Sequence, residues 1–241
     1  MGEDRYVNDF EEEFTIAPSN QYVGEFRQER KILIVVGPQG SGNHIWAKIF
    51  GLHFDVYGWR ALQEKYWEAH HYEPFARAWN DPKILKFPED YSYFVTSCSI
   101  PYVYKGGHRV PPILEFIKAV EKQDVKPIVA IVSRDKNIIE FQQERVRGKI
   151  TLNDAHRAID EIKDAYPDLH LHFLSYEGLY LWRNHYLKFL SDEMLFPIAY
   201  NKTSNIDKIL KYDANTKYII NPGPQELDKV VGKTYGDSLN V

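Results

Sequence analysis

A glycine-rich segment in the first third of the chain has the composition of a phosphate-binding loop. Residues 37–44 read Gly-Pro-Gln-Gly-Ser-Gly-Asn-His. Glycines allow the backbone to curl so that several N–H groups point at one anion, and a helix that begins there adds the positive end of its dipole. The segment follows an apolar run at residues 32–36 and precedes a helical pattern, which is the order that a phosphate loop requires. The sequence therefore predicts an anion-binding site at residues 37–44.

This loop departs from the ATP-binding pattern at two positions. Gly37 and Gly42 match the spacing of G-x-x-x-x-G-K-[ST]. Asn43, however, stands in place of the lysine, and His44 in place of the hydroxyl that holds Mg²⁺. A nucleoside or nucleotide kinase, one alternative, would need both groups and would use Asp135 at the end of an apolar strand as a metal ligand. We therefore expect anion binding without a metal.

Four short segments resemble segments of the sulfotransferase superfamily. That family's loop reads P-K-S-G-T-T-W or a close variant, and another of its segments reads Lys-Thr-His-Leu-Pro. An arginine follows one of its core strands, and a Tyr-Glu-Asp-Leu segment follows another. The counterparts here are residues 38–44, 96–101, 131–135 and 175–179, the last followed by Phe-Leu at 189–190. The chain is therefore similar to a divergent member of this superfamily.

The resemblance implies that the chain uses 3′-phosphoadenylyl sulfate and needs no metal. In the family the loop holds the 5′-phosphosulfate. An arginine and a serine eight residues later grip the 3′-phosphate, and a tyrosine lies near the adenine. By position, the resemblance assigns these roles to Arg134, to Gln142 in place of the serine, and to Tyr176. The implied loop contacts are Gly40, Ser41, Gly42, Asn43 and His44.

Sulfuryl transfer to a hydroxyl also needs a base that takes the proton of the acceptor oxygen. The resemblance puts Ser99 where many members have a catalytic histidine, and a serine is a poor base. His44 is the nearest candidate, because a helix N-terminus lowers the pKa of a histidine and keeps it neutral. We therefore expect His44 and Ser99 at the catalytic position. Other candidates for the base are His53, His70, His71, His108, Glu64, Glu68 and Glu73.

The family's loop lysine is missing, so another cation would have to stabilise the developing charge. Arg60, Lys105 and Arg109 lie in segments that could reach the loop. The second alternative is a non-catalytic nucleotide- or anion-binding module that has lost its catalytic groups. For an active enzyme the acceptor would be a small molecule or a glycan. The aromatic stretch at residues 66–79 either packs in the core or forms a wall of the acceptor site.

Hydrophobic patterns along the chain predict the elements that position these residues. Strand patterns occur at residues 32–36, 93–98, 127–132 and 169–174, and helical patterns at 43–51, 60–80, 111–122, from 137, 151–166 and 179–190. Thr151 is expected to cap its helix, with Asp154 three residues later. The alternation of strands and helices predicts an α/β class, a three-layer P-loop-type fold with a central parallel sheet flanked by helices.

One sulfotransferase-like P-loop domain is predicted over residues 31–241, with a loop-rich tail from residue 221. Residues 1–30 are acidic and polar, which predicts a flexible or loosely docked extension.

The composition narrows the class of protein and its partners. The 241 residues carry a net charge of −4 and a single cysteine, Cys98. This charge gives no reason to expect a nucleic-acid partner, and one cysteine excludes a disulfide framework. The chain has no apolar run of about 18 residues that would indicate a membrane span and no apolar leader. We expect a cytoplasmic protein, and the composition leaves its oligomeric state open.

Overall fold

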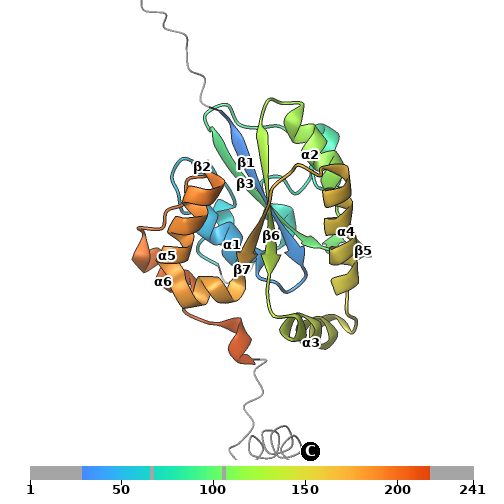
Figure 1. Ribbon diagram of the computed structural model, residues 1–241, viewed down its shortest axis with the longest axis vertical. Helices are drawn as coiled ribbons and strands as arrows, with labels where there is room; N and C mark the ends of the chain where they lie inside the picture. Colours follow the sequence, from blue (N-terminus) through green and yellow to red (C-terminus); the bar gives the residue numbers. More distant parts are fainter. Residues whose placement is uncertain (1–28, 66–67, 105–106, 218–241) are drawn as a thin grey trace, which may run out of the picture.

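The computed structural model describes residues 29–65, 68–104 and 107–217 and has an α/β fold (Figure 1). Five parallel strands form one sheet in the order β2-β3-β1-β6-β7. Their bounds are β1 Lys31–Pro38, β2 Val56–Tyr57, β3 Tyr93–Ile100, β6 Lys126–Ser133 and β7 Leu171–Ser175. The prediction of a central parallel sheet flanked by helices is confirmed. The predicted N-terminal extension, except residues 29–30, and the loop-rich tail lie outside the described residues.

Helices cover both faces of this sheet, which explains the continuous apolar run in β1 (Figure 1). Ile32 and Ile34 belong to the hydrophobic cluster that includes residues of α2 and α4. Leu33 and Val35 belong to the cluster that includes residues of α1, α5 and α6. The bounds of these helices are α1 Asn43–Phe50, α2 Ile113–Glu121, α4 Leu152–Ala165, α5 Tyr176–Met194 and α6 Thr203–Ile209.

The remaining elements are short or lie at the margins of the sheet. Helix α3, Lys136–Arg147, follows β6 at its carboxyl end (Figure 1). Helix α5 is interrupted at Arg183, whose φ of 44° and ψ of −116° are not helical. The 3₁₀ helices are η1 Arg60–Leu62, η2 His70–Tyr72, η3 Pro82–Ile84 and η4 Ala214–Lys217, and β4 Tyr102–Tyr104 pairs with β5 Gly107–Arg109 in an antiparallel hairpin.

The helix predicted over residues 60–80 is wrong. In the described part of this segment the helical structure is limited to η1 and η2. Pro74 disfavours the helical conformation of the residue before it, and Glu73 accordingly has an extended ψ of 137°. Phe75 and Trp79 enter the hydrophobic core from this irregular segment, so these two aromatic side chains have a packing role.

Thr151 is the N-cap residue of α4, as predicted, but the expected capping by its side chain is wrong. The Thr151 side chain makes no capping hydrogen bond to its helix. Its hydroxyl instead donates to Gln39 Oε1 at 3.4 Å, and its backbone N–H donates to Gln143 Oε1 at 2.7 Å. The start of α4 is therefore tied to the segment after β1 and to α3.

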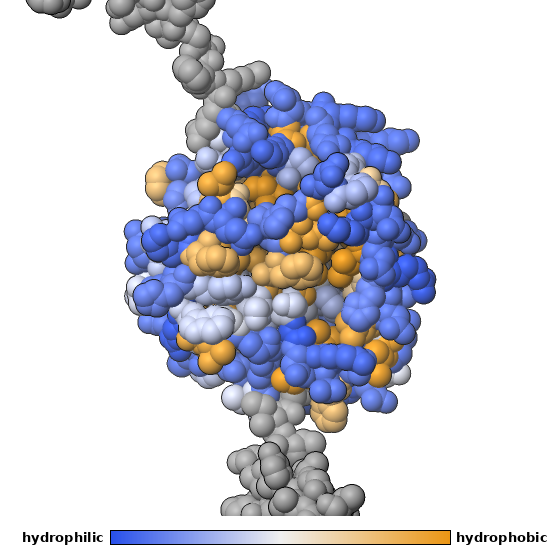
Figure 2. All heavy atoms as spheres, viewed as in Figure 1, coloured by the Kyte–Doolittle hydropathy of each residue, from blue (hydrophilic) through white to orange (hydrophobic). Residues whose placement is uncertain are grey.

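The outer surface is mainly polar. Figure 2 shows that hydrophilic side chains cover most of the face in view and that hydrophobic ones gather near its middle. Large apolar side chains are exposed on β7 and α5, among them Phe173, Trp182 and Phe189. Within residues 29–65, 68–104 and 107–217, no helix is both long enough and apolar enough to cross a bilayer.

Candidate anion-binding loop

The glycine-rich segment forms a tight loop between β1, which ends at Pro38, and α1, which begins at Asn43. Gly40 and Gly42 have φ angles of 86° and 110°, a region that side-chain-bearing residues rarely adopt. The Ser41 N–H donates to the Pro38 carbonyl at 3.1 Å and closes the turn. The loop thus needs glycine at both positions for its backbone conformation.

Several amides of this loop have no hydrogen-bond acceptor among the described residues. Among the residues that the structure describes, none accepts a hydrogen bond from the N–H groups of Gly40, Gly42 and Asn43. The Gly42 carbonyl accepts from Ile45 and begins α1, so these amides lie at the positive end of the helix. The loop also lies at the carboxyl end of a central strand, where ligands of open parallel α/β sheets commonly bind.

Arg134 brings a positive charge to the loop from the strand beside it. It follows the last residue of β6, and its side chain is 9% exposed. Its Nη1 donates to the Gly40 carbonyl at 2.6 Å and to Gln142 Oε1 at 3.1 Å. Its Nε donates to Asn215 Oδ1 at 2.7 Å. The guanidinium is therefore held in place against the loop by three segments that are far apart in the sequence.

Gln142 and Tyr176 also contact the two glycines. A Cβ atom at Gly40 would lie 3.0 Å from Gln142 Oε1, and one at Gly42 would lie 2.8 Å from a ring carbon of Tyr176. The Arg134 guanidinium lies 4.3 Å from the centre of the Tyr176 ring. The structure therefore brings together Arg134, Gln142 and Tyr176, the three residues that the resemblance assigns to the cofactor outside the loop. The same contacts give the glycines a packing role besides their conformational one.

Asp213 and Ala214 hold the hydroxyl of Tyr176. The Tyr176 hydroxyl donates to Asp213 Oδ1 at 3.2 Å and accepts from the Ala214 N–H at 3.0 Å. Burial raises the pKa of Tyr176 above its usual value, so the phenol stays protonated. Nothing in the sequence marked Asp213 or Asn215 as neighbours of the loop, because these residues are 37 and 81 positions from their partners.

Ser41 and Asn43 anchor the loop rather than point out of it. Both are buried. The Asn43 amide donates to Ser99 Oγ at 3.0 Å and to the Gly37 carbonyl at 3.3 Å, and the Ser41 hydroxyl donates to Asn43 Oδ1 at 3.4 Å. Ser99 lies next to the loop because β3 pairs with β1 and places it beside Gly37. The structure thus puts Ser99 at the loop and gives its hydroxyl the Asn43 amide as a donor.

His44 lies on the first turn of α1 and is held by the segment after η1. Its Nε2 lies 3.1 Å from the Glu68 carbonyl oxygen, and its ring centre lies 5.1 Å from that of Trp59. A carbonyl only accepts, so Nε2 carries the proton and the lone pair of the neutral ring is on Nδ1. Burial is the main cause that lowers the pKa of His44, with smaller contributions from His70 and Lys48. The predicted lowered pKa thus has burial, rather than the helix end, as its main cause.

Two further titratable side chains lie at β3, near its carboxyl end. His70 Nε2 lies 2.6 Å from the Ser97 carbonyl oxygen, and burial lowers the pKa of His70. Glu73 accepts from the Thr96 hydroxyl at 2.7 Å and from the Phe75 N–H at 2.8 Å. Burial raises the pKa of Glu73 to about 8. Both residues are among the candidate bases named from the sequence, and the structure buries Glu73 in an irregular segment instead of the helix expected over residues 60–80.

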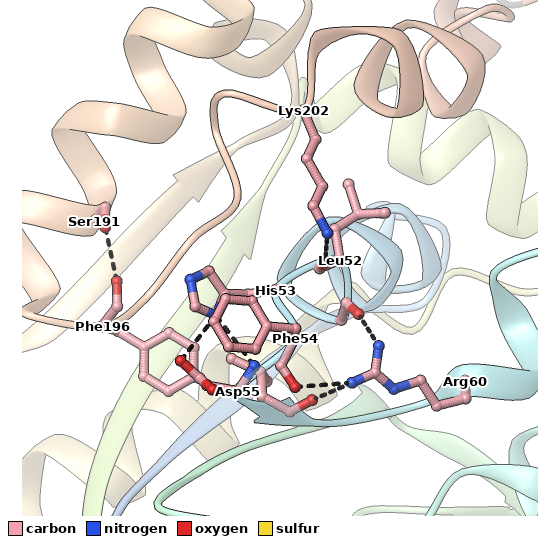
Figure 3. A network of polar contacts seen from close by, with 10 residues as sticks. Leu52, His53, Phe54, Asp55, Arg60, Ser191, Phe196 and Lys202 are labelled. Atoms are coloured by element: carbon pink, nitrogen blue, oxygen red, sulfur yellow. Dashed lines mark hydrogen bonds and ion pairs between the residues drawn. The ribbon is translucent and has the colours of Figure 1, made fainter.

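Two of the three cations expected to replace the missing lysine, Arg60 and Arg109, have other partners. Arg60 donates to the carbonyls of Gly51 at 3.0 Å and Val56 at 2.9 Å, after the carboxyl end of α1 and so at the end away from the loop (Figure 3). Arg109 lies 5.1 Å over the ring of Tyr104 in the hairpin. Lys105 lies outside the described residues. The described cation that contacts the loop backbone by a hydrogen bond is Arg134.

Asp135, the metal ligand expected for a kinase, has a structural role. Its carboxylate accepts from the Ile138 N–H at 3.1 Å and caps α3. Its own N–H donates to Glu177 Oε1 at 3.1 Å. The capping contact gives this carboxylate a partner in its own helix, which does not favour the kinase alternative.

Comparisons with known proteins give a single kind of match. No protein-family model matches the chain, and no curated protein matches it. Among solved structures, the chain is similar to mouse sulfotransferase SULT7A1 complexed with PAP, with 13% sequence identity and a TM-score of 0.39. The alignment covers 83% of this chain and 70% of the mouse chain.

Proposed function

We propose that the chain is a sulfotransferase-like enzyme that binds 3′-phosphoadenylyl sulfate at residues 37–44 and sulfates a hydroxyl of a small molecule or carbohydrate. One observation carries the proposal: Arg134, Gln142 and Tyr176 all contact the glycine-rich loop. The sequence resemblance assigns these three residues to the cofactor, although they come from segments that are separate along the chain. Their meeting at the carboxyl end of β1 supports a common ligand.

The donor groups of the loop fit a phosphosulfate that needs no metal. The N–H groups of Gly40, Gly42 and Asn43 offer hydrogen bonds at a helix N-terminus, which favours anions. The Arg134 guanidinium adds the charge and the planar donor set that suit a phosphate. Gln142 is next to Arg134 and offers an amide, and the buried Tyr176 ring lies against the Arg134 guanidinium and would hold it in position.

The chemical step would form a bond from the acceptor oxygen to sulfur and break the bond from sulfur to the phosphate oxygen. We assign the acceptor proton to Nδ1 of His44, because Nε2 is occupied by the Glu68 carbonyl. A lowered pKa keeps this ring neutral and able to accept a proton. Ser99 would position Asn43 through the hydrogen bond between their side chains.

A non-catalytic nucleotide-binding module is the second candidate, and a specific observation favours it. Asn43 occupies the position of the lysine in the ATP-binding pattern. Its side-chain amide is turned towards Ser99 and Gly37 inside the protein. The loop itself therefore contributes no positive side chain. Binding without turnover is the behaviour expected of such a module.

Calorimetry with adenosine 3′,5′-bisphosphate, without Mg²⁺, tests the site. We expect the wild-type chain to bind, and Arg134→Ala to weaken binding by roughly 2–4 kcal/mol, as for a lost charge-assisted contact. Arg134→Lys keeps the positive charge but loses the planar, forked donor set of the guanidinium. It should therefore lose less affinity than Arg134→Ala. Arg157→Ala, an exposed position on α4, is the matched control and should bind like the wild type.

Two results would contradict the proposal: no bisphosphate binding by the wild-type chain, or equal binding by a folded Arg134→Ala variant. ATP binding that requires Mg²⁺ would instead support a kinase. Turnover of 3′-phosphoadenylyl sulfate against a panel of hydroxyl acceptors separates the enzyme from the non-catalytic module. Bisphosphate binding with no turnover on the panel would favour the module.

A further inference from the structure

A second cluster of chemically active side chains lies at the amino end of β7, the end of the sheet away from the loop. His170 Nε2 lies 3.1 Å from Glu193 Oε1, and His172 Nδ1 lies 3.0 Å from the same oxygen. The centres of the two imidazole rings are 4.5 Å apart. All three donor atoms lie within 4.8 Å of one another. Within the described part of the chain, this is the group of histidine, cysteine and carboxylate side chains whose geometry suits a metal ion.

The sequence places these side chains together for simple reasons. His170 and His172 are two residues apart, so they lie on the same face of extended chain. Glu193 is in the last turn of α5, which packs against β7. The His172 side chain is 10% exposed, whereas those of His170 and Glu193 are 73% and 35% exposed. An ion could therefore reach the cluster from solvent.

Two histidines and one carboxylate are a common zinc ligand set, which leaves a fourth position for water. Zinc–nitrogen and zinc–oxygen bonds of about 2.0–2.2 Å put the ligand atoms of a tetrahedral site roughly 3.3–3.5 Å apart. The two nitrogen–oxygen separations of 3.1 and 3.0 Å are already close to that value.

We propose that His170, His172 and Glu193 form a zinc-binding site that joins β7, the edge strand of the sheet, to the carboxyl end of α5. The site is independent of the loop, because β7 runs from this cluster to Ser175, and the loop contacts begin at Tyr176. Zinc bound here would stabilise the folded chain, since a metal that binds only the native state adds to its stability.

The test uses the full chain, first stripped of metal and then titrated with Zn²⁺ in competition with a chromogenic chelator. We expect one zinc ion per chain. We expect His170→Gln and Glu193→Gln each to weaken zinc binding at least about tenfold, because each removes a ligand. His170 is exposed, so its substitution should leave the fold intact. The matched control is His156→Gln, an exposed histidine on α4, and should bind zinc like the wild type.

Thermal unfolding gives a second, independent measurement of zinc binding. Zinc should raise the Tm of the wild type and of the control variant but not that of His170→Gln. The proposal is overturned if the wild-type chain takes up no stoichiometric zinc, in which case the cluster is only a set of ion pairs. It is equally overturned if His170→Gln and Glu193→Gln bind zinc as tightly as the wild type, because the ion would then lie elsewhere.

Discussion

Glu73 is a carboxyl group in an apolar interior, beside the end of β3. Its side chain is 4% exposed and has two donors, the Thr96 hydroxyl and the Phe75 N–H. Loss of hydration outweighs these hydrogen bonds and raises the pKa of Glu73 to about 8. At neutral pH the carboxyl is therefore mainly protonated in the folded chain and ionised in the unfolded chain, whose pKa is near the ordinary 4.5.

This difference predicts that Glu73 makes stability depend on pH. The stabilisation from the protonated carboxyl is fully present below about pH 4.5 and is lost as the pH rises through about 8. Between these values the stability of the wild type relative to Glu73→Gln should fall by up to about 1.4 kcal/mol per pH unit. Urea unfolding of both proteins at several pH values between 5 and 8 measures this difference in stability. A constant difference would show that Glu73 does not change its protonation on folding.

The catalytic assignment of His44 depends on one contact more than on its place in the sequence. The Glu68 carbonyl fixes the proton on Nε2, so the lone pair of the neutral ring is on Nδ1. No sequence pattern predicts this contact, because Glu68 follows in an irregular segment that the hydrophobic pattern assigned to a helix. The position of His44 beside the loop made it a candidate base from the sequence, but the tautomer of its ring could not be predicted.

Gln143 joins three elements through a single buried amide. Its Nε2 donates to the Gln39 carbonyl at 2.8 Å, next to the loop after β1, and its Oε1 accepts from the Thr151 N–H at 2.7 Å. The side chain is fully buried on α3. It therefore links the loop, α3 and the first turn of α4.

Gln143→Ala should destabilise the protein by about 2–6 kcal/mol, since it leaves a buried carbonyl and a buried N–H without partners, each at about 1–3 kcal/mol. Urea unfolding monitored by tryptophan fluorescence measures this change. Glu144→Ala, the next and exposed position on α3, should stay within about 0.5 kcal/mol of the wild type. An equally small effect at Gln143 would mean that water or a shifted backbone replaces both bonds.

Sequence patterns predicted an element well where only one kind of structure explains the pattern of apolar residues. Residues 32–36 are apolar throughout because helices cover both faces of β1, and β6 follows the same rule. The segment at residues 60–80 has apolar residues at helical spacing for a different reason. Separate turns around Pro74 insert Phe75 and Trp79 into the core one by one. Spacing alone does not distinguish these two causes.

The candidate site was predictable where local geometry builds it. Arg134 follows a core strand, and Gln142 lies on the helix that starts after it, so eight residues bring both side chains to the loop. Asp213 and Asn215 reach the same place from the end of the described chain, and no short-range pattern predicts such a long-range contact. The hydrogen bonds of Asp213 with Tyr176 and of Asn215 with Arg134 were therefore visible only in the structure.

The sheet order explains why the loop and the zinc cluster can serve different purposes in one protein. The strands are parallel, so every carboxyl end lies on the side of the loop, and every amino end lies on the opposite side. The loop belongs to the central strand β1, while His172 belongs to the edge strand β7. The proposed anion site and the proposed zinc site are thus separated by the length and half the width of the sheet.

The three-layer arrangement makes a prediction about the core as a unit. Leu33 and Ile34 are neighbours in β1, but their side chains enter opposite hydrophobic clusters, one on each face of the sheet. Because both are fully buried, Leu33→Ala and Ile34→Ala should each destabilise the chain by about 2–5 kcal/mol in urea unfolding. Val146→Ala on α3, at 58% exposure, should change stability by less than about 0.5 kcal/mol. If one of the two β1 substitutions had as little effect as this control, helices would not cover that face of the sheet in solution.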